Sequence, residues 1–176
     1  MRTYGPRYLS LAAVLLAASP LRALAQEEAP LRMIYAVWKD SAGADKAIKN
    51  MSKGALDQVE AHAVLVKDKA GEVKVAERYS KPGSARAAQA SQVVDTAIAR
   101  LNRPIPSAAD SVSGYAPNQP ARRLSEEDLK KVVGMLGPGE SALILLSPKP
   151  AVSQIQRFLG TGMQSDAEVI EIEVKD

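Results

Sequence analysis

The chain has 176 residues, no cysteine and a formal net charge of +3. That charge lies in residues 1–25, which contain Arg2, Arg7 and Arg22 and no acidic residue; without them the 23 basic residues fall to 20 and balance the 20 acidic ones. A neutral chain of about 150 residues predicts one ordinary globular domain without disulfides, and gives no electrostatic reason to expect a nucleic-acid partner.

The first 25 residues predict a secretory signal peptide. Arg2 and Arg7 precede the apolar run LSLAAVLLAA (9–18), and the small residues ALA (23–25) precede Gln26. This layout is that of a signal peptide, and its apolar run is much shorter than the roughly 20 residues that a membrane-spanning helix needs. We therefore expect cleavage after Ala25, a periplasmic or secreted protein, and no stable membrane insertion of the mature chain. The alternative is an uncleaved N-terminal anchor.

After a short leader (26–32), the sequence predicts a strand and then a helix. The continuous apolar run MIYAVW (33–38) is typical of a strand that is buried on both faces. In the following segment, apolar residues recur at helical spacing. Asp40 or Ser41 can cap the start of this helix, and Gly54 can end it.

The next segment, AHAVLVKDKAGEVKV (61–75), predicts a β-hairpin. Two alternating apolar stretches flank the charged sequence KDKAG. In this turn Asp68 can start the reversal and Gly71 can supply a positive φ. The hairpin also contains the only histidine of the chain, His62.

Residues 81–123 differ in composition and are interpreted as an insertion. Within them, residues 84–101 carry a weak apolar stripe that predicts a helix. Residues 102–123 contain four prolines and mostly small polar residues, so we expect an irregular segment that is the least ordered part of the mature chain.

Regular patterns return in the C-terminal part. Ser125 and Asp128 resemble a capping box before the helical sequence EEDLKKVVGML. The continuous apolar run SALILLS (141–147) predicts a second buried strand, and residues 150–160 predict a helix with proline near its first turn and glycine at its end. The sequence EVIEIEV (168–174) alternates strictly and predicts a strand with one wet face.

The order of these elements predicts an α+β fold. Without the insertion it is strand–helix–strand–(strand), then strand–helix–strand, which is the ferredoxin-like split βαβ plan with an extra hairpin strand. We expect a single domain over residues 33–176. In this plan the first and third main strands (33–38 and 141–147) are central, in agreement with their continuous apolar runs, and the second and last lie at the edges.

Three segments resemble a bacterial family called domain of unknown function 1269. They are the strand and helix in RMIYAVWKDSAGADKAIKNM, the hairpin AHAVLVKDKAGEVKV, and the helix–strand–helix segment LSEEDLKKVVGMLGPGESALILLSPKPAVSQIQRFLG, together covering most of residues 33–160. The family's strand motif "lkPGtSALflLv" is matched at Gly137, Pro138, Gly139, Ser141, Ala142 and Leu143. Family members usually carry a hydrophobic hairpin between the two halves, but residues 81–123 are too polar and proline-rich for a bilayer. The resemblance implies no established activity and no membrane role.

His62 and Trp38 are the candidate ligand or pocket residues. A lone histidine without further ligands at metal spacing is most simply structural, because metals need several converging ligands. Its alternative role is in a dimeric α+β-barrel enzyme or a haem-binding protein. Trp38 ends a strand and could line a small pocket. Glu171 and Glu173 form a carboxylate pair that the outer face of an edge strand explains.

No catalytic set, metal site or cofactor site is predicted. The sequence GTG (160–162) follows a helix and lacks the lysine of a phosphate-binding loop. We therefore expect an exported non-enzymatic binding or interaction module that recognises a partner protein or a small ligand without a cofactor. We also expect a homo-oligomer, because the open sheet face of this fold commonly pairs with a second copy.

Overall fold

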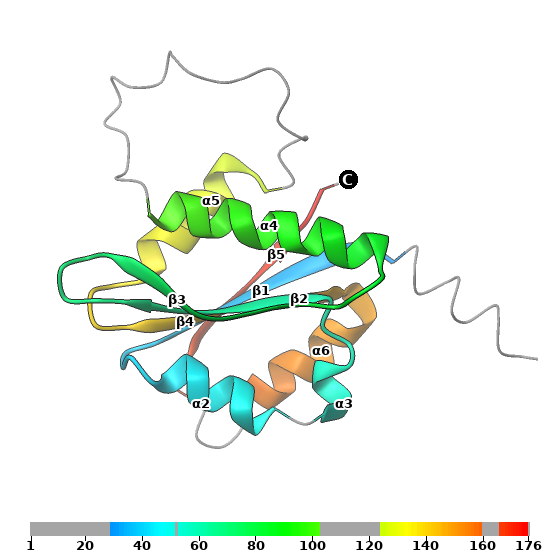
Figure 1. Cartoon of the computed structure of the whole chain (residues 1–176), viewed down its shortest axis with the longest axis horizontal. Helices are drawn as coiled ribbons and strands as arrows, with labels where there is room; N and C mark the ends of the chain where they lie inside the picture. Colours follow the sequence, from blue (N-terminus) through cyan, green and yellow to red (C-terminus); the bar gives the residue numbers. More distant parts are fainter. Residues whose placement is uncertain (1–28, 52, 103–123, 160–165, 176) are drawn as a thin grey trace, which may run out of the picture.

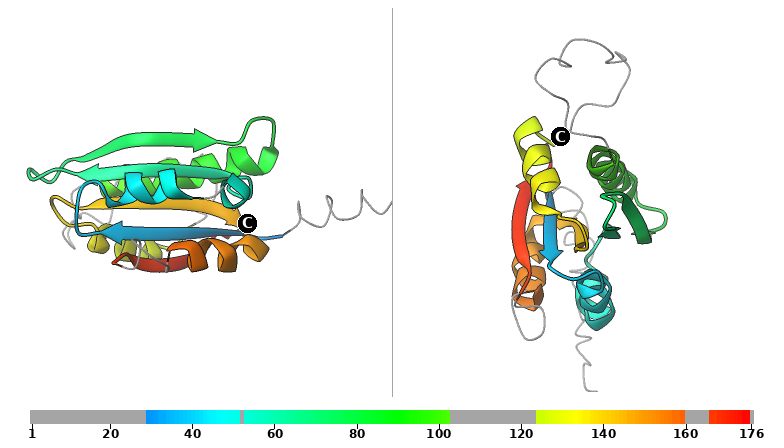
Figure 2. Two further views of the ribbon diagram at one scale, coloured as in Figure 1. Left: turned by 90° about the horizontal axis from the view of Figure 1, so that it is seen from below. Right: turned by 90° about the vertical axis from the view of Figure 1, so that its left-hand side faces the viewer.

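The computed structural model of the chain describes residues 29–51, 53–102, 124–159 and 166–175. The predicted signal peptide (1–25), nearly all of the predicted irregular segment (102–123) and the GTG sequence lie outside these residues. The described part contains one antiparallel sheet of five strands, in the order β3-β2-β4-β1-β5 (Figures 1 and 2). Its strands are β1 (Leu31–Trp38), β2 (Ala61–Lys67), β3 (Val73–Ser80), β4 (Ser141–Pro148) and β5 (Glu168–Glu173).

Helices cover both faces of this sheet (Figure 1). One face carries α2 (Gly43–Asn50), α3 (Lys53–Leu56) and α6 (Lys149–Leu159), and the other carries α4 (Ala85–Leu101) and α5 (Glu126–Met135). None of the helices in the described ranges is long and apolar enough to cross a bilayer.

The α+β fold and its central strands are confirmed. The strands β2-β4-β1-β5 follow the ferredoxin-like order, with β1 and β4 in the middle of the sheet. Leu143 and Leu145 of β4 lie opposite Ala36 and Ile34 of β1. All residues of β4 are buried, as a strand covered by helices on both faces requires.

The second main strand does not lie at the edge, as the sequence had suggested. β3 pairs with the outer side of β2 over Ala61–Lys67, so β2 is an interior strand and β3 is the edge. Burial follows this order, because the first five residues of β2 are buried, whereas only Val73 of β3 is buried. The hairpin itself is confirmed, and its turn places Gly71 at a φ of 90°.

The helix α4, within the predicted insertion 81–123, belongs to the core of the domain. The predicted stripe of this helix is buried against the sheet through Ala90, Val93, Val94, Ala97 and Leu101. Together with α5, it covers the face on which a second copy was expected to pair. The prediction of a homo-oligomer therefore loses the open sheet face on which it rested.

Each face of the sheet has its own apolar core. The core between the sheet and helices α4 and α5 includes Met33, Tyr35 and Ile144. The core between the sheet and helices α2, α3 and α6 includes Ile34 and Leu145. Alternate residues of each central strand contribute to opposite cores, because successive side chains of a strand point to opposite faces.

The start of α2 is capped from the other half of the chain. The N-cap position is Ala42, whose side chain cannot accept a hydrogen bond. Instead, the Ser141 hydroxyl accepts from the backbone N–H of Ala44 (3.0 Å) and donates to the carbonyl oxygen of Asp40 (2.6 Å). The predicted Asp40 contributes only before the helix, where its Oδ1 accepts from the N–H of Ala42 (2.9 Å), while Ser141 caps the first turn; α2 ends at Asn50, before the predicted Gly54.

The predicted cap of α5 by Ser125 is confirmed, and α4 has a similar cap at Ser84 that was not predicted. The Ser125 hydroxyl accepts from the N–H of Asp128 (3.0 Å) at the start of α5, and Ser84 does the same for α4 by accepting from Ala87 (3.2 Å). These two helices begin where the local sequence indicates, because their caps come from within the same turn.

A bulge in the β2–β3 pair decides which side chains of β3 reach each face. Val64 pairs with Glu77, but the next residue, Leu65, pairs with Val75, so Ala76 is an extra residue on β3. Val75 consequently lies on the α4 side with Leu65, whereas Glu77 and the following Tyr79 lie on the α2, α3 and α6 side.

Candidate functional site

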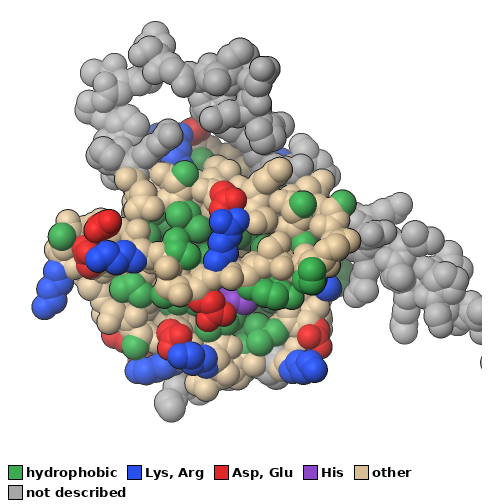
Figure 3. Space-filling view, in the orientation of Figure 1, with side chains coloured by type: hydrophobic (Ala, Val, Ile, Leu, Met, Phe, Trp, Pro, Cys, Tyr) green, Lys and Arg blue, Asp and Glu red, His purple; other side chains and the backbone are tan. Residues whose placement is uncertain are grey.

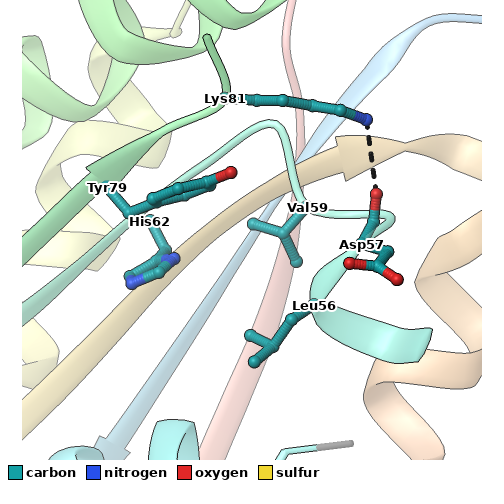
Figure 4. Close-up of a pocket in the computed structure, with 6 residues that line it drawn as sticks. All are labelled: Leu56, Asp57, Val59, His62, Tyr79 and Lys81. Carbon is teal, nitrogen blue, oxygen red and sulfur yellow. Dashed lines mark hydrogen bonds between the residues drawn. The ribbon is translucent and has the colours of Figure 1, made fainter. Parts of the chain in front are cut away.

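A half-open pocket lies where the end of β3 meets α3, and Figure 4 shows its lining residues. Its volume is about 400 Å³. The lining comes from the end of α3, the connection to β2, β2 itself and the end of β3, through Leu56, Asp57, Val59, His62, Tyr79 and Lys81. The pocket therefore depends on the β2–β3 pairing and on the position of α3 beside it.

The stacked rings of His62 and Tyr79 form one wall. These residues lie opposite each other in the β2–β3 pair, their ring centroids are 5.2 Å apart, and the rings are inclined by 22°. The His62 side chain is 7% exposed, while Tyr79 is 42% exposed. Tyr79 therefore shields the histidine and presents its own ring to solvent.

The His62 ring forms a hydrogen bond with a neighbouring side chain. Its Nε2 lies 3.1 Å from Oε1 of Glu77. An ionised carboxylate only accepts, so Nε2 is the donor in this pair. Nδ1 is buried and has no hydrogen-bond partner among the described residues. Nδ1 is thus buried and Nε2 faces Glu77, whereas a haem iron needs an accessible ring nitrogen.

The opposite side of the pocket has an apolar floor and a polar rim. Val59 is buried and Leu56 is half-buried. Above them, the Lys81 ammonium donates to the carbonyl oxygen of Asp57 (3.3 Å) and lies 3.8 Å from Oε1 of Glu60. The pocket thus combines an aromatic wall and aliphatic floor with charges at its rim.

β3 also carries the exposed large hydrophobic side chains of the described residues, Val75 (44% exposed) and Tyr79. Figure 3 looks onto the side of the molecule where β3 runs between the two helical layers, and hydrophobic side chains are visible on both sides of the strand. The histidine is visible only as a small patch, in agreement with its burial.

The other candidate, Trp38, lies in the core and not in this pocket. It ends β1 opposite Ser141 and is 3% exposed. The start of α2 packs directly against it, since a Cβ atom at Gly43 would lie 2.4 Å from the Trp38 Cβ and Cγ atoms. The structure places Trp38 and His62 at separate positions, and only His62 lines the pocket.

The carboxylates of Glu171 and Glu173 are held by one guanidinium. Arg32 lies 3.7 Å from Glu171 and 3.0 Å from Glu173, and Gln156 donates to Glu171 (3.1 Å). These contacts fit the wet side of an edge strand. No group of three or more His, Cys, Asp or Glu side chains in the described part of the chain could hold a metal ion.

Sequence reasoning found His62 but missed the remaining lining residues. Tyr79 could have been identified from the hairpin, because strands that leave the KDKAG turn must bring residues near 79 back to residues near 62. The sequence does not reveal the pairing of Tyr79 with His62, because the bulge at Ala76 shifts the register by one residue. This shift also changes the face of the sheet on which Tyr79 lies. Leu56, Asp57 and Val59 carry no sequence signal that distinguishes them from ordinary connecting residues.

The fold and the site define an α+β domain with a small aromatic pocket at one sheet edge. No protein-family model, curated protein or solved structure matches the chain. The resemblance of GPGESALILL and its companion segments to domain of unknown function 1269 therefore stays a prediction.

Proposed function

We propose that the chain is an exported, non-enzymatic binding module whose contact surface is the pocket between β3 and α3. The observation that carries this proposal is the exposed Tyr79 ring, which stacks on a buried histidine beside an aliphatic floor. An aromatic ring with one face on protein and the other in water can bury further apolar area when a ligand binds. Export rests on the signal-peptide pattern of residues 1–25.

The polar groups of the pocket favour binding over catalysis. A general base must reach the proton that it removes. His62 is engaged with Glu77, and the Lys81 ammonium is engaged with Asp57 and Glu60. These contacts hold the walls of the pocket in place. They support recognition by shape and apolar contact.

The ligand that this surface supports has an apolar or aromatic part small enough for about 400 Å³. This volume lies at the lower end of the 300–1,000 Å³ that is usual for small-molecule sites. It suits a small ligand or a single side chain of a partner protein. Because β3 is an edge strand of the sheet that the described residues form, a partner segment could also lie along it, beside the pocket.

Native mass spectrometry of the exported protein tests the proposal. We expect a retained small molecule or partner peptide on the wild type and on Val75→Ala, and its loss from Tyr79→Ala. Val75 is the matched control because it is as exposed as Tyr79 but lies on the other face of β3. The same spectra give the N-terminus, which we expect at Gln26. A bound species that survives Tyr79→Ala would contradict the proposed site.

The haem-binding or enzymatic alternative makes a different prediction for His62. If His62 were an iron ligand, haem titration of the wild type would give a visible spectrum that His62→Ala loses. Because the ring is buried and engaged with Glu77, we expect the two proteins to give identical spectra.

A further inference from the structure

A buried polar group lies at the end of β4. Ser147 is 0% exposed, and its hydroxyl oxygen has no hydrogen-bond partner among the described residues. Buried hydroxyls without partners are rare because each loses its bonds to water. The Ser147 hydroxyl, like that of Tyr35, therefore has no partner that the described side chains supply directly.

Glu60 presents the complementary group on the neighbouring strand. The backbone N–H of Glu60 donates to the carbonyl oxygen of Leu146 (2.8 Å), which places Glu60 beside the end of β4. Its Oε1 faces the Lys81 ammonium at 3.8 Å, but its Oε2 is buried and has no hydrogen-bond partner in the described part. An orphaned acceptor thus lies next to an orphaned hydroxyl.

Both side chains lie on the sheet face covered by α3 and α6. Ser147 shares a face with Leu145 because side chains alternate along a strand, and Leu145 belongs to the core on that side. Glu60 is placed there by its contact with Lys81, which in turn bonds to Asp57 at the end of α3. Arg32 lies opposite Ser147 on β1, where its guanidinium faces Glu171 and Glu173, and its Nε is a further buried donor without a hydrogen-bond partner among the described residues.

We propose that a buried water molecule binds between Ser147 and Glu60. It donates to Oε2 of Glu60 and accepts from the Ser147 hydroxyl. A water molecule suits this site because buried waters typically join polar groups that would otherwise lack partners. It also fixes the Glu60 carboxylate, whose other oxygen faces Lys81 at the rim of the pocket. This inference does not depend on the proposed function.

Ser141, at the other end of β4, is the internal control. It is as buried as Ser147, but its hydroxyl donates to Asp40 and accepts from Ala44. Its donor is thus used and one acceptor position is filled. The proposal therefore predicts a water at the Ser147 hydroxyl and none at the Ser141 hydroxyl.

A crystal structure that resolves ordered waters tests whether a water molecule lies between Ser147 and Glu60. We expect a water within about 3.2 Å of both Ser147 Oγ and Glu60 Oε2. In solution, we expect a nuclear Overhauser effect from bound water to the amide of Glu60 or Ser147, which Ser147→Val removes. A direct bond from Ser147 to Glu60 or to a carbonyl oxygen, with no water between them, would overturn the proposal. So would the absence of the water signal in the wild type.

Discussion

At the scale of single residues, polar side chains in the described part matter mainly through the backbone groups that they satisfy. Ser141 is the clearest example, because it caps a helix that lies 97 residues away in the sequence. Sequence reasoning looked for this cap next to the helix, at Asp40 or Ser41. It could not find Ser141, because a cap supplied from another strand leaves no local pattern.

Removal of the Ser141 hydroxyl should destabilise the protein. Ser141→Ala leaves the N–H of Ala44 and the carbonyl of Asp40 without this partner, and loss of a cap costs about 0.5–2 kcal/mol. Urea unfolding measures this loss. Ser153→Ala, an exposed position in α6, is the control and should change the free energy of unfolding little. Equal values for the two variants would mean that Ser141 does not cap α2.

Glu140 should make the stability depend on pH. The N–H of Gly137 donates to its carboxylate (2.7 Å) and Lys39 pairs with it (2.9 Å), and these contacts lower the pKa of Glu140. A carboxyl group with a lowered pKa stabilises the fold above its unfolded pKa of about 4.3, and this contribution is lost as the pH falls through the lower folded pKa. The difference in unfolding free energy between wild type and Glu140→Gln should therefore be largest near neutral pH and shrink in acid. A difference that does not change with pH would exclude this role.

Removing the buried Tyr35 hydroxyl should not destabilise the protein, in contrast to removing the Ser141 hydroxyl. Burial in the core raises the pKa of Tyr35, with a smaller contribution from Glu140, so the ring stays neutral. Its hydroxyl has no hydrogen-bond partner among the described residues. Tyr35→Phe removes this unsatisfied group and should leave the melting temperature unchanged or raise it. A clear fall in melting temperature would indicate that the hydroxyl has a partner in solution.

At the scale of elements, continuous apolar runs were the most reliable signals. MIYAVW and SALILLS predicted the two central strands, because only a strand with helices on both faces hides every side chain from water. The apolar stripe of residues 84–101 predicted α4 but not its place. Small residues such as Ala90 and Ala97 give a weak stripe in the sequence, yet they allow the helix to lie close to the sheet.

The central position of β4 predicts a large effect of truncating its leucines. Leu143 and Leu145 are fully buried, so Leu143→Ala or Leu145→Ala should cost about 2–5 kcal/mol by leaving a cavity. Glu171→Ala removes a half-exposed ion pair with Arg32 and should cost at most about 1 kcal/mol. Thermal unfolding compares the three variants. Equal and small shifts would show that the β4–β1 pairing is wrong.

At the scale of the whole molecule, the predicted fold was right in the order of its four main strands and incomplete in its fifth strand and its layers. Four strands follow the ferredoxin-like plan, while β3 extends the sheet and α4 and α5 cover its second face. The order of elements in the sequence does not say whether helices cover one face of the sheet or both. That depends on the face against which the helix within residues 81–123 packs. Because α4 and α5 cover this face, the face inferred for a second copy is not open, and β3 and β5 are the edge strands of the described sheet.

The candidate site arises only at this scale. His62 could be selected from the sequence because it is the only histidine, but Tyr79, Leu56 and Lys81 meet it through pairing, a bulge and the end of α3. These are tertiary features, and no regular spacing of residues in the sequence indicates them. The central claim is therefore that these dispersed residues form one binding surface.

Chemical-shift mapping with a library of small aromatic and aliphatic fragments tests this claim most directly. We predict that binding fragments shift the amides of Val59, His62, Tyr79 and Lys81 together. Tyr79→Ala should abolish these shifts and Val75→Ala should preserve them. Fragments that bind elsewhere, or that still bind at this pocket in Tyr79→Ala, would contradict the account.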